Sequence, residues 1–288
     1  MPLIERAVPK VNLTLRVLGK RPDGYHELDS LVAFALDVGD VIMLWPGHPA
    51  RVRVTGPFTG SIAGENLISV ALDHVARAGP QLVLGAVSLE KNLPIAAGIG
   101  GGSADAAAVL RAVKRANPEL ADSVDWTAVA ARIGADVPVC FVSSAQRMTG
   151  IGEILETMAG LPDLYAVLVN PMVAVPADKT ARVFRALAAP LLGEAREPCT
   201  VAFANRAALL AHMATTGNDL TAAARRVVPA IDDVLAGLCA DETCELAQLS
   251  GGGPTCFGIF PDMAAAREAA ARIAAAQPDW WVVASRLM

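Results

Sequence analysis

The sequence predicts an α+β protein of two domains with a sizeable core. Segments with a strand pattern and segments with a helix pattern are mixed along the chain, without the strict alternation of a doubly wound parallel sheet. Hydrophobic residues make up 53% of the 288 residues and charged residues 18%, which supplies ample apolar surface for a core. Because the pattern changes after about residue 150, we expect domains at 1–155 and 156–288, with a final strand that can rejoin the first domain.

In the first half, short runs of β-branched and apolar residues bounded by turn residues predict strands. Runs in which apolar residues recur at helical spacing predict helices. The expected strands are Val11–Val17, Leu31–Ala35, Val41–Leu44, Arg51–Thr55 and Leu82–Leu89, and the expected helices are Glu65–Arg77, Ser103–Ala116 and Trp126–Ile133. A turn-rich loop, Gly19–His26, follows the first strand.

The same two patterns recur in the second half. The expected strands are Ala166–Val169, Cys256–Phe260 and Trp280–Ser285, and the expected helices are Ala177–Leu187, Asn218–Val227, Ile231–Cys239 and Met263–Ala275. We expect Pro190–Pro198 to be a surface loop.

Composition argues against several classes of protein. A net charge of -5 and a pI near 5.4 disfavour a protein that binds nucleic acid through phosphate contacts. Although the mean hydropathy is +0.43, no stretch reaches the roughly 18–20 apolar residues of a membrane-spanning helix. Met1–Lys10 lacks the apolar segment of a signal peptide. We therefore expect a soluble cytoplasmic protein with no nucleic-acid or membrane partner.

The cysteines disfavour a disulfide framework and a zinc site. They are odd in number and lack the CxxC spacing of common zinc ligands. The five cysteines are Cys140, Cys199, Cys239, Cys244 and Cys256.

The most informative segment is a glycine-rich loop between an expected strand and an expected helix. Glycines let the backbone approach a ligand closely, and the helix that follows offers free N–H groups and a partial positive charge. This pattern favours a phosphate-binding loop over the simpler interpretation, a turn in which Ser103 caps the helix. The loop residues are Pro94, Ile95, Ala96, Ala97, Gly98, Ile99, Gly100, Gly101, Gly102, Ser103 and Ala104.

Two common phosphate-binding motifs do not fit this loop. A Walker A motif requires a lysine after its last glycine, but Gly102 is followed by Ser103. A dinucleotide fingerprint, GxGxxG, matches Gly98 and Gly100 but then meets Ser103 instead of the third glycine.

The loop resembles the PxxxGxGGGSA motif of the GHMP kinases. Two more segments resemble motifs of that family in the same order, namely Ala7–Leu13 and Leu249–Phe257. The resemblance implies a ribosomal-protein-S5-domain-2-like N-terminal domain followed by a ferredoxin-like C-terminal domain. It also implies ATP as co-substrate, with Mg²⁺ bridging the phosphates. The sequence offers no carboxylate cluster for the metal, and Ser103 is the best protein contact.

Further segments resemble one branch of the family, the 4-diphosphocytidyl-2-C-methyl-D-erythritol kinases. They are Lys20–Leu28, Gly134–Pro138, Gly150–Glu153 and Asn218–Leu220. The resemblance implies that ATP phosphorylates the 2-hydroxyl of 4-diphosphocytidyl-2-C-methyl-D-erythritol, in the non-mevalonate isoprenoid pathway. We expect a monomer or a weak homodimer.

The resemblance also assigns roles to residues outside the loop. Asp136 is the general base for the attacking hydroxyl, and Lys10 keeps that carboxylate ionised and stabilises phosphoryl charge. His26, together with Tyr25, holds the cytosine, and Asn12 faces the diol end of the substrate. Taken alone, Asp136 reads as a helix-terminal residue bonded to backbone N–H groups, and Lys10 as an ordinary charge at a strand edge.

Two residues keep alternative interpretations. Asn66 and Lys91 either flank the nucleotide or serve as a helix cap and a strand-end charge. The chain departs from the usual family pattern at Pro9, Ala104 and Gly252, but these departures leave Lys10 and Asp136 in place. The alternatives to the leading hypothesis are another GHMP kinase, a non-catalytic nucleotide-binding member of the fold and, more remotely, a dehydrogenase.

Overall fold

A computed structural model describes residues 1–59, 66–193 and 202–288 and has the expected α+β architecture. The chain forms two compact units, each assembled from several stretches. Unit 1 comprises Met1–Lys10, Val38–Ile95 and Gly100–Ser143, and unit 2 comprises Val11–Asp37, Ala96–Ile99 and Ser144–Met288. This division differs from a single border near residue 155, because strands from both halves of the chain pair with each other in unit 2.

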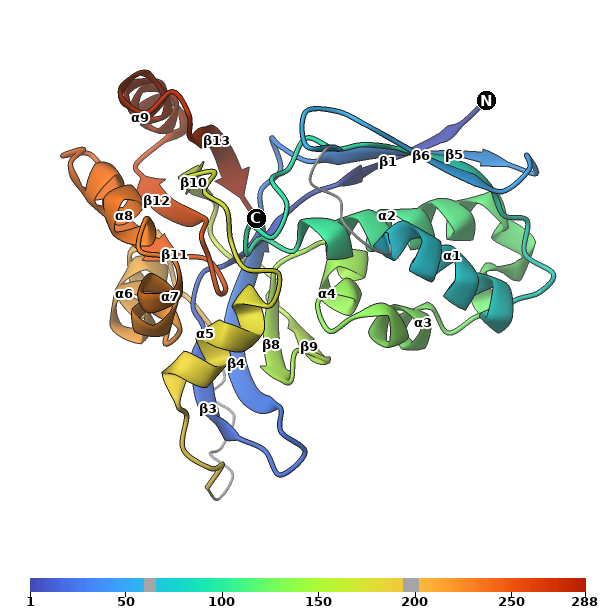
Figure 1. Ribbon diagram of the computed structural model, residues 1–288, viewed down its shortest axis with the longest axis horizontal. Helices are drawn as coiled ribbons and strands as arrows, with labels where there is room; N and C mark the ends of the chain where they lie inside the picture. The colour runs from blue at the N-terminus through green and yellow to red at the C-terminus, as the bar shows by residue number, and fades with distance from the viewer. Residues whose placement is uncertain (60–65, 194–201) are drawn as a thin grey trace. The chain divides into compact units, whose positions relative to one another are not determined.

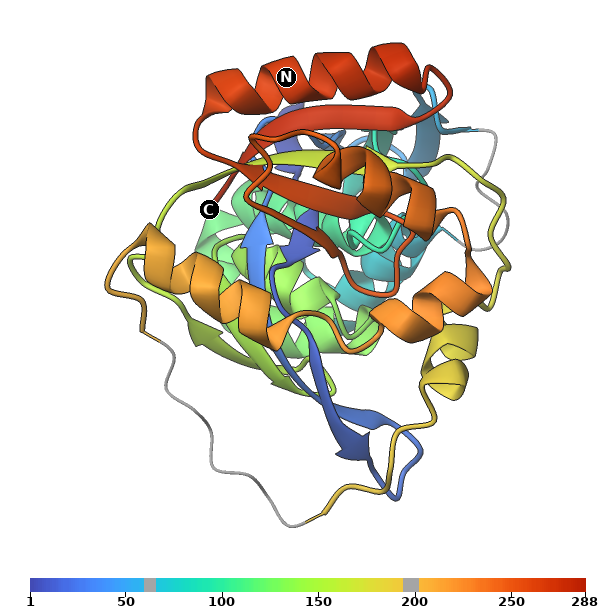
Figure 2. The ribbon, with the colours of Figure 1, turned by 90° about the vertical axis from the view of Figure 1, so that its left-hand side faces the viewer.

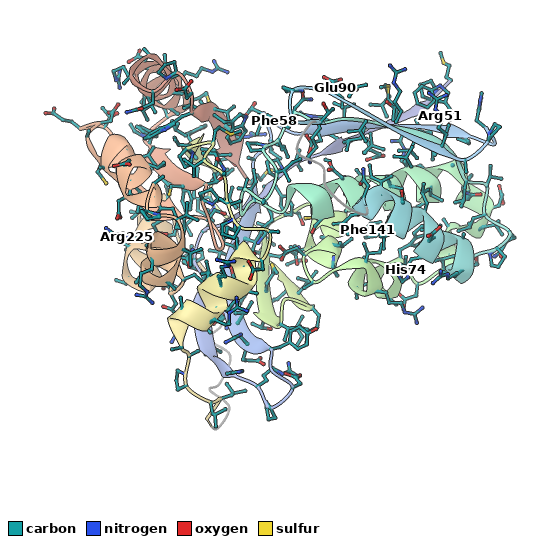
Figure 3. All side chains as sticks on the ribbon, viewed as in Figure 1. Arg51, Phe58, His74, Glu90, Phe141 and Arg225 are labelled. Carbon is teal, nitrogen blue, oxygen red and sulfur yellow. The ribbon has the colours of Figure 1, made fainter. Side chains whose placement is uncertain are left out.

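Unit 1 contains a four-stranded sheet in the order β1-β5-β7-β6. The strands are β1 (Leu3–Ala7), β5 (Asp40–Pro46), β6 (Arg51–Thr55) and β7 (Gly85–Glu90). β6 and β7 are parallel, and α1 (Leu67–Ala78) forms the crossover between them. The other pairs are antiparallel. Arg51 and Glu90, labelled in Figure 3, are exposed on this sheet.

Four helices lie on one side of this sheet (Figure 1). They are α1, α2 (Gly101–Ala116), α3 (Trp126–Ile133) and α4 (Val137–Val142), with a short 3₁₀ helix over Pro118–Ser123. α2 packs against β1 and β5 on one side and against α1 and α4 on the other. Most of its residues from Ala104 to Val113 are buried, because alanines allow its neighbours to approach closely.

Unit 2 contains two sheets. The five-stranded sheet runs β2-β4-β8-β9, and β3 also pairs with β4. Its strands are β2 (Lys10–Asn12), β3 (Arg16–Lys20), β4 (His26–Phe34), β8 (Gln146–Gly150) and β9 (Ile154–Thr157). β4 joins β3 to β8 with antiparallel pairing on both sides, so residues from the start and the middle of the chain share one sheet.

The other sheet of unit 2 is antiparallel, in the order β11-β12-β10-β13. Its strands are β10 (Leu164–Asn170), β11 (Leu246–Leu249), β12 (Cys256–Phe260) and β13 (Trp281–Leu287), and the helices of the unit are α5 (Lys179–Leu187), α6 (Arg206–Thr216), α7 (Thr221–Val227), α8 (Ile231–Cys239) and α9 (Met263–Ala276). α9 packs along β13 and β10, as Figure 2 shows, and α8 packs on β11 and β12. The final strand thus pairs within unit 2.

Several expected elements match the structure residue for residue. They are β6, α3, α8 and β12. The expected strand Val11–Val17 was wrong as a single element, because it breaks between β2 and β3. There the N–H groups of Leu13 and Thr14 both donate to the carbonyl of Leu31, which marks an extra residue in the strand.

Seven elements among the described residues were not expected from the sequence, namely β1, β8, β9, β11, α4, α6 and the 3₁₀ helix Pro118–Ser123. Most are short, so their local pattern is weak. Glu65, Cys199 and residues 194–198 of the expected surface loop lie outside the described residues. The other four cysteines are free thiols. Within the described ranges, no helix is both long and apolar enough to cross a membrane.

Candidate active site

The glycine-rich loop connects β7 to α2 and passes from one unit to the other. Pro94 and Ile95 belong to unit 1, Ala96–Ile99 to unit 2, and Gly100 onward to unit 1 again. Each part is held by contacts within its own unit.

In unit 1, the loop ends at the N-terminus of α2. Gly100 is the N-cap residue, with a left-handed backbone (φ +65°). The first hydrogen bond of the helix joins the N–H of Ala104 to the carbonyl of Gly100 at 2.8 Å. The N–H groups of Gly101, Gly102 and Ser103 thus precede this first helical bond, as an anion-binding helix terminus requires. The alternative in which Ser103 caps the helix is wrong, since Ser103 lies in its first turn.

Lys10 and Asp136 form an ion pair in unit 1. The Nζ atom of Lys10 lies 3.4 Å from Oδ2 of Asp136. The lysine side chain is 7% exposed and the aspartate side chain 38%, so the carboxylate is the accessible member of the pair. Asp136 occupies the N-cap position of α4, but its side chain makes no capping hydrogen bond. The simpler interpretation of Asp136 as a helix-capping residue is therefore wrong.

The stem of Lys10 packs against the start of α2. A Cβ atom added at Gly100 would lie 2.9 Å from Cγ of Lys10. Only a residue without a side chain fits this position, so Gly100 brings the lysine next to the helix N-terminus. The ion pair and the N–H groups of α2 are thus neighbours within unit 1.

Unit 1 also contains a buried ion cluster, formed by Lys91, which precedes the loop, and by Asp40 and Asp105. The Nζ atom of Lys91 bonds Asp40 and lies 2.7 Å from Oδ2 of Asp105. Asp40 also accepts N–H groups from Asn92 and, at 2.8 Å, from Leu93. All three charged residues are buried. Lys91 is thus a partner of carboxylates, and Asn66, through its side chain, caps α1.

One lysine cannot balance two buried carboxylates. Burial raises the pKa of Asp105 to about 8, opposed by the Lys91 ammonium and assisted by the Asp40 carboxylate. Burial also lowers the pKa of Lys91, but the two carboxylates outweigh it and the net shift is upward. Oδ1 of Asp105 has no hydrogen-bond partner among the described residues. Burial therefore disfavours the charged form of Asp105.

In unit 2, the middle of the loop is bonded to the loop between β11 and β12. The carbonyl of Ala97 accepts the N–H of Thr255 at 3.0 Å, and the carbonyl of Gly98 accepts the hydroxyl of Ser250 at 3.2 Å. Gly98 has a left-handed backbone (φ +81°), and an added Cβ would lie 2.6 Å from the carbonyl oxygen of Gly253. The two glycine-rich loops of the sequence therefore touch backbone to backbone.

Asn12 is bonded to the same network. Its N–H donates to the hydroxyl of Ser250 at 3.2 Å, and its side-chain amide donates to the hydroxyl of Ser30 at 2.8 Å. Asn12 is 2% exposed. The structure thus connects Asn12 to Gly98 through a single serine hydroxyl, a link that the motifs did not indicate.

His26 and Tyr25 lie where β4 begins. Tyr25 is 60% exposed, and His26 stacks on Phe184 of α5 with ring centroids 4.7 Å apart. Burial lowers the pKa of His26, and Lys20 adds to the effect, which favours the neutral imidazole. Phe184 was missed because the sequence shows it only as one apolar residue on an expected helix.

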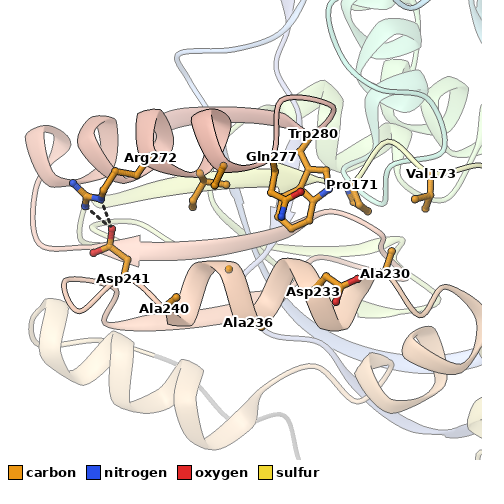
Figure 4. Close-up of a pocket in the computed structure, with 13 residues that line it drawn as sticks. Pro171, Val173, Ala230, Asp233, Ala236, Ala240, Asp241, Arg272, Gln277 and Trp280 are labelled. Carbon is orange, nitrogen blue, oxygen red and sulfur yellow. Dashed lines mark hydrogen bonds and ion pairs between the residues drawn. The ribbon is translucent and has the colours of Figure 1, made fainter.

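A hollow of about 620 Å³ lies elsewhere in unit 2, between α8 and α9 (Figure 4). Small residues of α8 and the Trp280 ring line it, and Arg272 pairs with Asp241 at one end. It contains none of the residues expected to bind ATP or substrate. The described residues contain no cluster of three or more metal-binding side chains.

Comparison with known proteins defines the class. Residues 66–144 match the model of the GHMP kinase N-terminal domain, and residues 198–279 match that of the C-terminal domain. A homoserine kinase from Cytophaga hutchinsonii shares the fold, with a TM-score of 0.68 at 16% identity over 98% of this chain and 93% of that one. The chain is thus an ATP-dependent kinase of the GHMP family.

Full-length relatives place it within the class. A 4-diphosphocytidyl-2-C-methyl-D-erythritol kinase of Methylorubrum extorquens is 47% identical over 99% of both chains, and one of Paramagnetospirillum magneticum is 43% identical over 98% of this chain and 97% of its own. The crystal structure of a 4-(cytidine 5'-diphospho)-2C-methyl-D-erythritol kinase, 32% identical, has a TM-score of 0.76 over 99% of both chains. The chain belongs to the 4-diphosphocytidyl-2-C-methyl-D-erythritol kinase family.

The contact between the two glycine-rich loops predicts that Gly98 tolerates no side chain. We expect Gly98→Ala to lower the free energy of unfolding by about 2–4 kcal/mol, because a left-handed alanine is strained and its Cβ would collide with Gly253. Urea unfolding followed by tryptophan fluorescence measures the change. Gly252→Ala is the matched control, since an added Cβ there meets nothing within 4 Å. Equal stabilities of the two variants would contradict the packing.

The raised pKa of Asp105 predicts a dependence of stability on pH. Because the folded pKa, about 8, lies above the unfolded value, the stability that Asp105 contributes is fully present below its unfolded pKa and is lost as pH rises through about 8. Asp105→Asn should remove this loss. Between pH 5 and pH 8 the wild type should lose about 3–4 kcal/mol of unfolding free energy that the variant retains. Urea unfolding at both pH values tests this, with the exposed Asp122→Asn as control. Parallel pH profiles for wild type and Asp105→Asn would refute the assignment.

Proposed function

We propose that this kinase transfers the γ-phosphoryl group of ATP to the 2-hydroxyl of 4-diphosphocytidyl-2-C-methyl-D-erythritol, a step of the non-mevalonate isoprenoid pathway. The names and full-length coverage of its relatives support the substrate. The observation that carries the chemistry is the ion pair of Lys10 with an accessible Asp136 beside the N-terminus of α2. The partners are small molecules only, and the protein acts as a monomer or a weak homodimer in the cytoplasm.

Asp136 is the general base in this proposal. Its carboxylate accepts the proton of the 2-hydroxyl as the hydroxyl oxygen bonds to the γ-phosphorus. The bond from that phosphorus to the bridging oxygen breaks, and ADP leaves with the electron pair. Because the Asp136 side chain does not cap α4 and is 38% exposed, the carboxylate is available to a hydroxyl.

Lys10 and the start of α2 supply positive charge. The Lys10 ammonium balances the carboxylate and stabilises charge on the transferred phosphoryl group. The loop residues Pro94–Ala104 bind ATP, and the N–H groups that precede the first helical bond donate hydrogen bonds to its phosphate oxygens.

A Mg²⁺ ion fits this site even without a carboxylate cluster. Magnesium keeps several water ligands and is often held chiefly by nucleotide phosphates, so one protein oxygen suffices. The Ser103 hydroxyl, in the first turn of α2, is the protein group that would contact it. When bound, the ion neutralises phosphate charge.

The cytidine end of the substrate binds at the start of β4. The neutral imidazole of His26 can donate from one ring nitrogen and accept at the other, as the polar edge of cytosine requires. Tyr25 is exposed and Phe184 stacks on His26, so aromatic faces lie next to that imidazole. We assign the diol end of the substrate to Asn12, two residues after Lys10 in β2.

The test is incubation of the purified protein with ATP, Mg²⁺ and 4-diphosphocytidyl-2-C-methyl-D-erythritol, following ADP and phosphorylated product together. We expect ADP release that depends on this substrate, matched by a 2-phosphate product. Transfer to homoserine or mevalonate instead would show that the protein acts on a different substrate from the one proposed. Binding of ATP without any transfer would make the chain a non-catalytic member of the fold.

The base assignment predicts the behaviour of Asp136→Asn. The amide cannot accept the proton, so kcat should fall by about 10²–10⁴-fold while the dissociation constant for ATP stays within about threefold. Steady-state kinetics and ATP titration measure the two quantities. Asp122→Asn, an exposed aspartate of unit 1, should turn over like the wild type. Wild-type turnover by Asp136→Asn would remove Asp136 from the mechanism.

The assignment of His26 to cytosine predicts that His26→Ala changes the KM for one substrate and not for the other. The KM for the cytidine substrate should rise by about tenfold or more, since a hydrogen bond and a stacking face are lost, and the KM for ATP should change little. His48→Ala, at an exposed histidine, serves as the control. An unchanged KM for the cytidine substrate would place cytosine elsewhere.

A further inference from the structure

Lys179 is a buried lysine at a position where a lysine is unfavourable. It is the first residue of α5 and is 4% exposed. The N-terminus of a helix carries partial positive charge, which repels a cation. Burial of an ammonium group is also costly unless polar partners replace water. A residue that breaks two local rules at once requires an explanation from its contacts.

Two of its contacts are backbone carbonyls of two glycine-rich loops. The Nζ atom of Lys179 donates to the carbonyl of Ala96 at 2.8 Å and also to the carbonyl of Gly253. Ala96 belongs to the loop before α2, and Gly253 to the loop between β11 and β12. Hydrogen bonds from a charged donor are stronger than those between neutral groups. A single ammonium therefore joins two loops from a third element of the same unit.

The hydrogen bond to Ala96 is one of three that hold consecutive backbone carbonyls of the loop. The carbonyls of Ala96, Ala97 and Gly98 accept in turn from Lys179, the N–H of Thr255 and the hydroxyl of Ser250. Ala96 has a left-handed backbone (φ +54°), which is uncommon for a residue with a side chain. Such a conformation persists where its surroundings hold it, and Lys179 holds its carbonyl.

We infer that Lys179 is a positioning residue for ATP. Lys179 donates to the carbonyls of Ala96 and Gly253 and so holds the loop segment that begins at Ala96. This segment leads along the chain to Gly100 and to the N–H groups at the start of α2. Lys179 acts through the backbone and touches no reacting atom. The inference rests on one part of the proposed function, namely that this loop binds the phosphates of ATP.

The test is direct titration of Lys179→Met with ATP alone and, separately, with 4-diphosphocytidyl-2-C-methyl-D-erythritol. Methionine fills the space but donates no hydrogen bond. We expect the dissociation constant for ATP to rise by about tenfold or more and that for the second ligand to stay within about threefold. Lys179→Arg, which keeps several N–H donors, should recover ATP affinity to within about threefold of the wild type. Arg182→Met, on the same helix with a 53% exposed side chain, should leave both constants unchanged.

Two outcomes would overturn the inference. One is an unchanged affinity of Lys179→Met for ATP. The other is equal weakening of both ligands without recovery in Lys179→Arg, which a merely structural role would produce. If Lys179→Met does not fold, Lys179→Gln takes its place, because its shorter amide reaches only one carbonyl, and unchanged ATP affinity would again refute the role. Because ATP is titrated alone, failure of the wild type to phosphorylate the cytidine substrate would refute the substrate and not the role of Lys179.

Discussion

The buried ammonium of Lys91 joins the elements of unit 1 that surround the glycine-rich loop. It bonds carboxylates at the start of β5 and in the second turn of α2, and one of these also accepts the N–H groups that lead into the glycine-rich loop. The strand β5, the start of the glycine-rich loop and the helix α2 are therefore all held, directly or through Asp40, by the Lys91 ammonium. Because a buried ion cluster tolerates little change in geometry, it holds the N-terminal part of α2 in a fixed position within unit 1.

Unit 1 contains another ion-paired lysine, Lys10, and its carboxylate partner is accessible rather than buried. Lys10 pairs with a single carboxylate, and that carboxylate remains accessible. Lys91 pairs with two, and both are buried. The contrast explains why similar residue types serve different purposes, since a charge enclosed by partners provides rigidity, whereas a charge with an accessible partner can act on a substrate.

Motifs in the sequence indicated those candidate site residues that are neighbours in the chain or that carry a family pattern. The loop, Lys10 and Asp136 were identified in this way, and the structure shows the last two as an ion pair. Phe184 and Ser250 were not identified, because each acquires its place from a partner more than a hundred residues away. The strands β1 and β11 were missed because pairing with a neighbouring strand, rather than their local pattern, makes them strands.

The interleaving of the two units constrains how the chain is made. Unit 1 includes residues 1–10 and 100–143, while unit 2 includes residues 11–37 and the strand β13, which ends at Leu287. During synthesis from the N-terminus, unit 1 can close once residue 143 has left the ribosome, but the early strands of unit 2 must wait for the later ones. β10 stays an open edge until β13 pairs with it. Until β13 is made, the nascent chain therefore carries an unpaired strand edge, a feature that promotes aggregation.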